Sequence, residues 1–187
     1  MIFSGCSITW GDELENKEDR YSTVLTKKLK TSENNISLCG ISNDAIVRRA
    51  VSFQPTEPII LQLTVPSRIE YFTEHGPQKF SVQRQMKPVI YRREMRSYYR
   101  EINNEQHEME NLFKNLFMFE QFCYANKLKH IILFADCDVK LHQGHWSSLC
   151  RGKIWSIWKD ILGYKHRGGH PSKEEHKRIA DFLLEIV

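Results

Sequence analysis

Apolar strand-like runs alternate with amphipathic helical segments along most of this 187-residue chain. The runs occupy residues 1–6, 35–40, 58–64 and 131–135, and each precedes a stretch with helical spacing of apolar side chains. The third run, PIILQLT, is almost continuously apolar, which is typical of a strand covered on both faces. Parallel strands need crossover connections, so this alternation predicts a parallel sheet with helices on both faces. We therefore expect a flavodoxin-like three-layer α/β/α sandwich with a short sheet of four or five strands.

The helices are expected at residues 21–29, 43–51, about 101–125 and 172–186. Ser42 or Asn43 is suited to cap the second helix, and Ser172 with Glu175 has the spacing of a capping box. The alternation of strand-like and helical segments stops at residues 65–100, which suggests an insertion with a hairpin or short elements. Because no repeat or linker divides the chain, we expect one domain over residues 1–187 with an inserted basic and aromatic segment at about 67–100.

Composition narrows the class of protein. Hydrophobic residues make up 41% of the chain and charged residues 27%, as in soluble globular proteins. No run approaches the roughly 20 apolar residues of a membrane helix, so no membrane partner is expected. Five dispersed cysteines without a C-x-x-C pair argue for a reducing compartment, and the N-terminus lacks a signal-peptide pattern. We expect a cytoplasmic protein without a cofactor.

Several polar or turn residues stand where the predicted strands end. Reactive groups gather at the carboxyl ends of parallel strands, and Ser7, Gly40, Thr64 and Asp136 each follow such a strand. A serine hydroxyl is a weak nucleophile without an adjacent base, so Ser7 alone is equally compatible with a helix-capping role. His170 lies in a Gly-Gly-His-Pro-Ser turn before the last helix, although most of the 8 histidines must be incidental.

Three short blocks, in order along the chain, resemble those of the SGNH/GDSL hydrolases. Residues 5–11 (GCSITWG) are similar to the block G-D-S-x-T-x-G, with Cys6 in place of aspartate. Residues 40–43 (GISN) resemble the second block, and residues 170–180, beginning His-Pro-Ser, resemble the last. The resemblance implies an SGNH fold and a carboxylic-ester hydrolase, with Ser7 as nucleophile, His170 as base and the amides of Ser7 and Gly40 as oxyanion donors.

The sequence also departs from this family. The third block, G-x-N-D, is replaced by residues 63–70 (LTVPSRIE), a T-x-x-x-R-x-E pattern similar to an uncharacterised, partly phage-borne branch. The Asn43 side chain or Thr64 would then replace the missing asparagine donor. Arg167 occupies the place of the aspartate three residues before His170. Either a Ser–His dyad operates with a backbone carbonyl as orienter, or Asp136 or Asp138 supplies the carboxylate.

Other polar residues have a functional and a structural interpretation. Arg68 and Glu70 are candidate substrate-binding residues. Arg68 would bind an acidic substrate group, or it would form an ion pair with Glu70 or with another surface acid. The basic, aromatic residues 79–100 suit a polyanion such as single-stranded nucleic acid, but equally a solvated lid or an oligomer contact. A zinc site among Asp136, Asp138, His142, His145 and His166 is disfavoured because no cysteine pair accompanies them, so no metal is expected.

The function expected is a serine esterase acting on a small-molecule or carbohydrate ester, such as an acetylated sugar. Two alternatives stay open. One is a catalytically inactive SGNH-like binding module. The other is a nucleic-acid or polyanion-binding protein that uses residues 79–100. The sequence does not select the acyl group or the oligomeric state.

Overall fold

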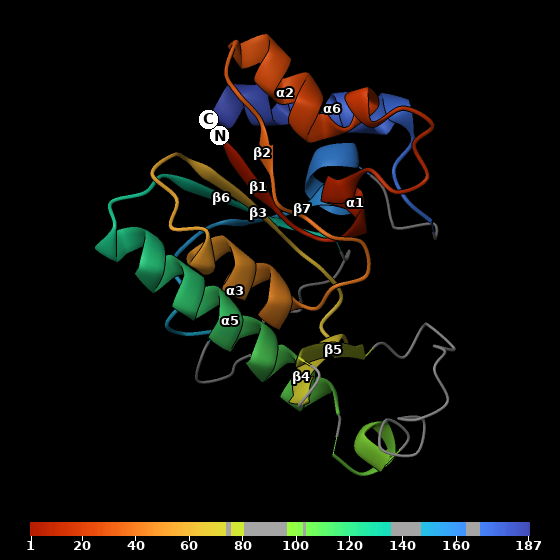
Figure 1. The fold of residues 1–187 in the computed structure, drawn as a ribbon, viewed down its shortest axis with the longest axis vertical. Coiled ribbons are helices and arrows are strands. Elements are labelled where there is room, and N and C mark those ends of the chain that lie inside the picture. Colours follow the sequence, from red (N-terminus) through yellow and green to blue (C-terminus); the bar gives the residue numbers. More distant parts are fainter. Residues whose placement is uncertain (74–75, 81–96, 103, 136–146, 164–168) are drawn as a thin grey trace.

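A five-stranded parallel sheet forms the centre of the protein (Figure 1). The computed structural model describes residues 1–73, 76–80, 97–102, 104–135, 147–163 and 169–187. The strand order is β2-β1-β3-β6-β7. The bounds are β1 (Ile2–Ser4), β2 (Asn34–Asn35), β3 (Ile59–Leu63), β6 (His130–Phe134) and β7 (Ile154–Ser156). This order is that of flavodoxin-like sheets, so the predicted fold class is confirmed.

Two pairs of helices cover the two faces of the sheet (Figure 1). The helices α2 (Tyr21–Leu29) and α6 (Lys173–Ile186) pack together on one face. On the other face lie α3 (Asn43–Ser52) and α5 (Glu105–Ala125). All five residues of β3 are buried, as the apolar run predicted. Alternate side chains of a strand face opposite sides, so Leu61 joins the core under α3 and α5 while Ile60 joins the core under α2 and α6.

The helix starts follow the capping residues in the sequence. The Ser42 hydroxyl accepts a hydrogen bond from the amide of Ala45, which makes Ser42 the N-cap of α3. At α6, Ser172 and Glu175 form both hydrogen bonds of a capping box, which confirms that prediction. Asn104 caps α5, which begins a few residues later than expected.

The second strand is shorter than predicted. Of the expected residues 35–40, only Asn35 belongs to β2, although the chain continues beside β1, where the amide of Ile36 donates to the Phe3 carbonyl and that of Leu38 to the Gly5 carbonyl. Two elements were not predicted at all. They are β7, with only three residues, and the π-helix η4 (Ile157–Leu162), whose buried side chains join the core beside α6.

Short elements surround the strand ends. The helix α1 (Ser7–Trp10) directly follows β1, and a 3₁₀ turn, η1 (Lys17–Asp19), precedes α2. After β3 the chain forms the antiparallel hairpin of β4 (Ile69–Thr73) and β5 (Gly76–Phe80), as expected for this segment. A π-helical turn, η3 (Tyr98–Ile102), comes before α5. In the described part of the chain, no helix combines the length and apolarity needed to cross a membrane.

Candidate active site

Ser7 is the first residue of α1 and stands at the carboxyl edge of the sheet (Figure 1). Its strand, β1, lies between β2 and β3, so the chain leaves β1 and returns on both sides of it. Ligands of open α/β sheets bind at such a switch point, in the crevice outside the carboxyl ends of the strands. Thr64 follows β3 at the same edge. The fold thus brings the ends of the first and third predicted strands together.

Gln62 of β3 holds the turn between β1 and α1. Its side-chain oxygen accepts hydrogen bonds from the Cys6 amide at 3.0 Å and from the Thr9 hydroxyl at 3.1 Å. Gly5 allows the close approach, since a Cβ there would lie 2.3 Å from Thr9 Oγ1 and 2.9 Å from Gln62 Cβ. Gln62 was not among the predicted site residues, although a lone amide inside the run IILQL is a usable signal.

The Ser7 side chain is buried in a small polar cluster. Its Oγ lies 3.2 Å from Cys6 Sγ, which also contacts Thr64 Oγ1 at 3.3 Å and Arg68 Nη1 at 3.0 Å. We call Cys6, Ser7, Thr64 and Arg68 the Ser7 cluster. Burial alone would raise the pKa of the Cys6 thiol, but the Arg68 charge and the two hydroxyls outweigh burial and hold that pKa below its ordinary value.

His170 is held by carboxylates from the loop that follows α1. Its backbone amide donates to Glu13 Oε2 at 3.3 Å, and its Nδ1 lies 3.2 Å from Glu13 Oε1. The second approach has the distance of a hydrogen bond but not the alignment, because Nδ1 has no hydrogen-bond partner. Asp12 Oδ2 lies 3.9 Å from Nε2. Glu13 adopts a left-handed backbone conformation, with φ at 66°, which is strained for a residue with a side chain.

The Ser7 and His170 side chains are not hydrogen-bonded to each other, since the Ser7 hydroxyl contacts Cys6. They are linked through Asp12, whose amide donates to the Ser7 carbonyl at 2.9 Å. A hydrogen bond from the Cys39 thiol is the main cause that holds the pKa of Asp12 below its usual range, and His170 adds to the effect. Catalytic hydrogen bonds are often long or poorly aligned before substrate binds.

Sequence reasoning missed Asp12 and Glu13 as partners of His170. Their signal was their position directly after Gly11, within the loop that begins at the nucleophile block. The carboxylates considered for this role, Asp136 and Asp138, lie outside the described residues, as does Arg167. Their contribution stays a prediction.

The four predicted oxyanion donors divide into two groups. The amide of Gly40 donates no hydrogen bond within the described part of the chain, whereas the amide of Ser7 interacts with the Cys6 sulfur and helps to lower the pKa of that thiol. Asn43 is engaged elsewhere, since its amide nitrogen donates to the Thr64 carbonyl at 3.0 Å and its oxygen accepts from the Thr64 amide at 2.8 Å. That exchange ties α3 to the end of β3 and occupies the backbone of Thr64. The Thr64 hydroxyl accepts from Cys6 and Arg68.

Arg68 and Glu70 do not pair with each other. Glu70 forms a two-pronged ion pair with Arg48 of α3, at 3.0 Å and 2.7 Å, and hydrogen bonding to Glu70 raises the pKa of Arg48. The alternative of an Arg68–Glu70 ion pair is therefore wrong. Although they are two residues apart in sequence, these side chains contact different neighbours. Glu70 pairs with Arg48, and Arg68 contacts Cys6 and Thr64 within the Ser7 cluster.

The basic segment and the zinc candidates are only partly described. Most of residues 79–100 lies outside the described residues, and Arg100 at its end pairs with Glu101. His142, His145 and His166 also lie outside. Among the residues that the structure describes, no group of three or more His, Cys, Asp or Glu side chains could hold a metal ion.

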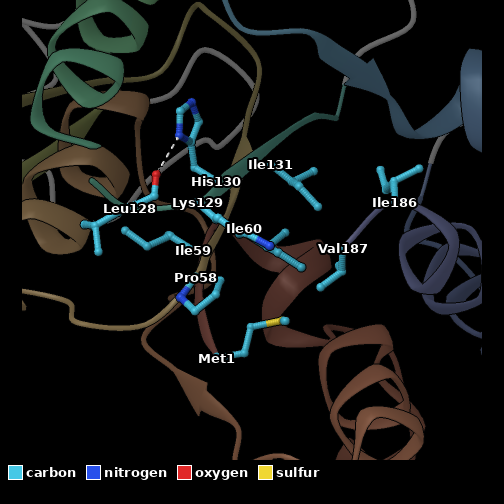
Figure 2. Close-up of a pocket in the computed structure, with 10 residues that line it drawn as sticks. All are labelled: Met1, Pro58, Ile59, Ile60, Leu128, Lys129, His130, Ile131, Ile186 and Val187. Carbon is cyan, nitrogen blue, oxygen red and sulfur yellow. Dashed lines mark hydrogen bonds between the residues drawn. The ribbon is translucent and has the colours of Figure 1, made fainter. Parts of the chain in front are cut away.

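A pocket of about 450 Å³ lies at the opposite edge of the sheet (Figure 2). Its walls come from the amino ends of β1, β3 and β6 and from the end of α6. Figure 2 shows mainly aliphatic side chains there, with Lys129 among them and His130 apart from the rest. It does not include Ser7 or His170, so the chemistry indicated by the sequence belongs to the other edge.

No protein-family model and no curated protein sequence matches this chain. Solved structures do match. A lipolytic protein of the G-D-S-L family from Desulfitobacterium hafniense aligns over 100% of this chain and 98% of its own, with 11% identity and a TM-score of 0.59. The chain has the SGNH hydrolase fold.

Two esterases agree with this assignment of the fold. The acetyl xylan esterase AlAXEase aligns over 100% of this chain and 98% of its own, with 15% identity and a TM-score of 0.58. The esterase EstA from Pseudoalteromonas aligns over 98% of this chain and 93% of its own, with 12% identity and a TM-score of 0.55. At these identities the likeness concerns the SGNH fold alone.

Proposed function

We propose that this protein is a serine esterase in which Ser7 attacks a carboxylic ester and His170 acts as base. The observation that carries the proposal is the position of Ser7 at the start of α1, at the switch point of an SGNH sheet. Support also comes from His170, whose backbone amide donates to Glu13 in the loop that follows α1 and whose Nδ1 lies 3.2 Å from the same carboxylate.

The reaction has two steps. His170 takes the Ser7 proton while Ser7 Oγ bonds to the ester carbon, and the carbonyl π electrons move onto oxygen. Collapse of this intermediate expels the alcohol, which takes the proton from His170 and leaves an acyl-enzyme. Water, deprotonated by His170, then attacks the acyl carbon; as the bond to Ser7 Oγ breaks, His170 returns the proton to Ser7 and the acid is released. The amides of Ser7 and Gly40 are suited to bind the oxyanion.

In this mechanism Glu13 orients the imidazole of His170, a role that the dyad hypothesis gave to a backbone carbonyl. A carboxylate at Nδ1 fixes the imidazole tautomer, directs Nε2 toward the serine and stabilises the imidazolium. We favour Glu13 for this role because it contacts His170 through both the ring and the backbone.

The substrate class proposed is an acyl ester, with acetylated carbohydrates as the first choice. The support is the match to an acetyl xylan esterase over the whole chain. The matches to EstA and to a G-D-S-L lipolytic protein keep simple esters within the proposal.

Hydrolysis of short-chain p-nitrophenyl esters and of acetylated xylo-oligosaccharides tests this function. Ser7→Ala should lower kcat by at least about 10³-fold, since removal of a catalytic serine abolishes the covalent path. Ser52→Ala, at an exposed serine at the end of α3, is the matched control. Equal hydrolysis by Ser7→Ala and the wild-type protein would contradict the proposal.

A second candidate is a non-catalytic binding module. The contact of the Ser7 hydroxyl with Cys6 rather than with His170 favours it. Acetylated xylo-oligosaccharides that bind without being hydrolysed, measured by calorimetry alongside the rate assay, would select this candidate.

A further inference from the structure

Arg68 brings a cation to Ser7 without a carboxylate partner of its own. Its Nη1 donates to Cys6 Sγ and to Thr64 Oγ1, each at 3.0 Å. Glu70, the nearest acid in sequence, is held by Arg48 instead. Within the described part of the chain, no carboxylate pairs with this guanidinium.

Much of the donor capacity of Arg68 is unused. A guanidinium carries five N–H donors in a rigid fork. Nη1 accounts for two of them, and Nε is buried without a hydrogen-bond partner. Buried donors normally find an acceptor, so the arrangement is complete only when a further oxygen atom comes to Arg68.

The position of Arg68 indicates which oxygen that is. Arg68 Nη1 and Ser7 Oγ contact the same sulfur atom, at 3.0 Å and 3.2 Å. An ester carbon under attack by Ser7 places its carbonyl oxygen beside the nucleophile, whereas a carboxylate farther along an acyl chain would lie away from it. The guanidinium is therefore next to the place where negative charge develops.

The two other side-chain candidates are neutral and already partly engaged. Asn43 exchanges hydrogen bonds with the Thr64 backbone, and the Thr64 hydroxyl accepts from Cys6 and Arg68. Each keeps one uncharged donor, the second amide N–H of Asn43 and the O–H of Thr64. A cationic donor also binds an oxyanion more strongly than a neutral amide does.

We propose that Arg68 is the oxyanion-binding side chain of this site, acting with the amides of Ser7 and Gly40. As Ser7 Oγ bonds to the ester carbon, the carbonyl π electrons move onto oxygen, and N–H groups of Arg68 donate to that oxygen. The hydrogen bonds from Arg68 weaken when the carbonyl double bond forms again and the alcohol leaves. This inference rests on the esterase function proposed above and adds one catalytic residue to it.

The test compares the wild-type protein with Arg68→Met and Arg68→Lys on p-nitrophenyl acetate, which is neutral. Loss of an oxyanion donor lowers kcat by about 10²–10³-fold and leaves KM nearly unchanged. Phosphonylation of Ser7 by a fluorophosphonate passes through a similar oxyanion and should slow by a comparable factor. Arg68→Lys keeps the charge but not the fork, so its kcat should fall less.

Arg151→Met is the control for loss of one positive charge, since Arg151 is exposed and precedes β7 at the opposite edge. Melting temperatures show whether each variant folds, and if Arg68→Met does not, Arg68→Lys must show the fall in kcat. Unchanged kcat and phosphonylation, or a loss confined to KM for the acidic p-nitrophenyl succinate, would overturn the role of Arg68. A wild-type protein that neither hydrolyses esters nor is phosphonylated would instead contradict the esterase function.

Discussion

Glu13 is the residue whose backbone and side chain are both unusual. It adopts a left-handed φ of 66°, which costs about 1–3 kcal/mol for a residue other than glycine. Strain of this kind persists where the surroundings hold it, often at functional sites. Here the conformation directs both carboxylate oxygens to His170, one to the backbone amide and one to the ring. We interpret the strain as the consequence of holding His170.

Replacing Glu13 by glutamine should impair catalysis more than folding. The amide cannot stabilise an imidazolium, and loss of the corresponding charge in a buried triad lowers kcat by about 10⁴-fold. Because the Glu13 side chain is 64% exposed and screened by water, we expect a smaller fall, about 10–10²-fold. Steady-state kinetics and melting curves measure both effects.

Glu15→Gln removes the same charge from an exposed neighbour in the same loop and should leave kcat unchanged. If Glu13→Gln matched this control, His170 would be oriented by another group, with Asp12 as the next candidate.

At the scale of elements, β3 positions the turn that carries Ser7. Gln62 points from the middle of an otherwise apolar strand to the amide of Cys6 and the hydroxyl of Thr9. Neither donor is exposed to water. This oxygen helps to hold α1 over the sheet, together with the hydrogen bond from the Asn35 side chain to the Thr9 carbonyl and the burial of Ile8.

Gln62→Leu should loosen this turn. Leucine keeps the apolar burial but leaves the Cys6 amide without its acceptor, and an unsatisfied buried donor costs about 1–3 kcal/mol. Urea unfolding should show a loss of stability of that size, together with slower phosphonylation of Ser7. Gln121→Leu on the exposed side of α5 is the control. Equal unfolding midpoints for the two variants would mean that α1 is held without Gln62.

The long elements were predictable because their patterns extend over many residues. The β3 run and the α5 stripe each repeat a signal several times, and the α6 pattern begins with a capping box. The three-residue β7 and the π-helix η4 carry no comparable pattern, and their burial depends on contacts with α6. The strand β2 covers only Asn34–Asn35, although beyond it the amides of Ile36 and Leu38 still donate to the carbonyls of Phe3 and Gly5.

The sequence predicted which strand ends carry the candidate site, but it did not predict which side chains contact each other there. The order of Ser7, Gly40 and Thr64 along the strands indicated one edge of the sheet, since parallel strands end together. The pairing of Glu70 with Arg48 rather than with Arg68 was not accessible, because it depends on how the β4–β5 hairpin meets α3. The same holds for Glu13 and His170, which are 157 residues apart.

For the whole molecule, the buried His176 connects folding to pH. Its Nδ1 accepts from the Tyr21 amide at 3.1 Å, its ring stacks on Tyr21, and its Nε2 is buried without a partner. Burial, with smaller contributions from His170 and Lys17 and against the opposing effect of Asp19, lowers its pKa to about 4. In the unfolded chain this histidine becomes protonated near pH 6.5, whereas in the folded protein it stays neutral until the pH is much lower.

The free energy of unfolding should therefore fall as the pH decreases from about 6.5 to about 4, by about 3 kcal/mol from this group. Above pH 6.5 the contribution of His176 is fully present. Urea titrations across this range should show the slope, and His176→Gln should flatten it. His107→Gln, at an exposed histidine of α5, should leave the slope unchanged. Parallel curves for the wild-type protein and His176→Gln would assign the pH dependence to other groups.

The central claim is that Ser7 is an activated nucleophile, and covalent labelling tests it most directly. The protein is incubated with a fluorophosphonate, its intact mass is measured, and the modified residue is located by peptide mapping. We predict one adduct, on Ser7, absent from Ser7→Ala and formed much more slowly by His170→Ala. No adduct on the folded wild-type protein, or an adduct on another residue with Ser7 unmodified, would contradict the account.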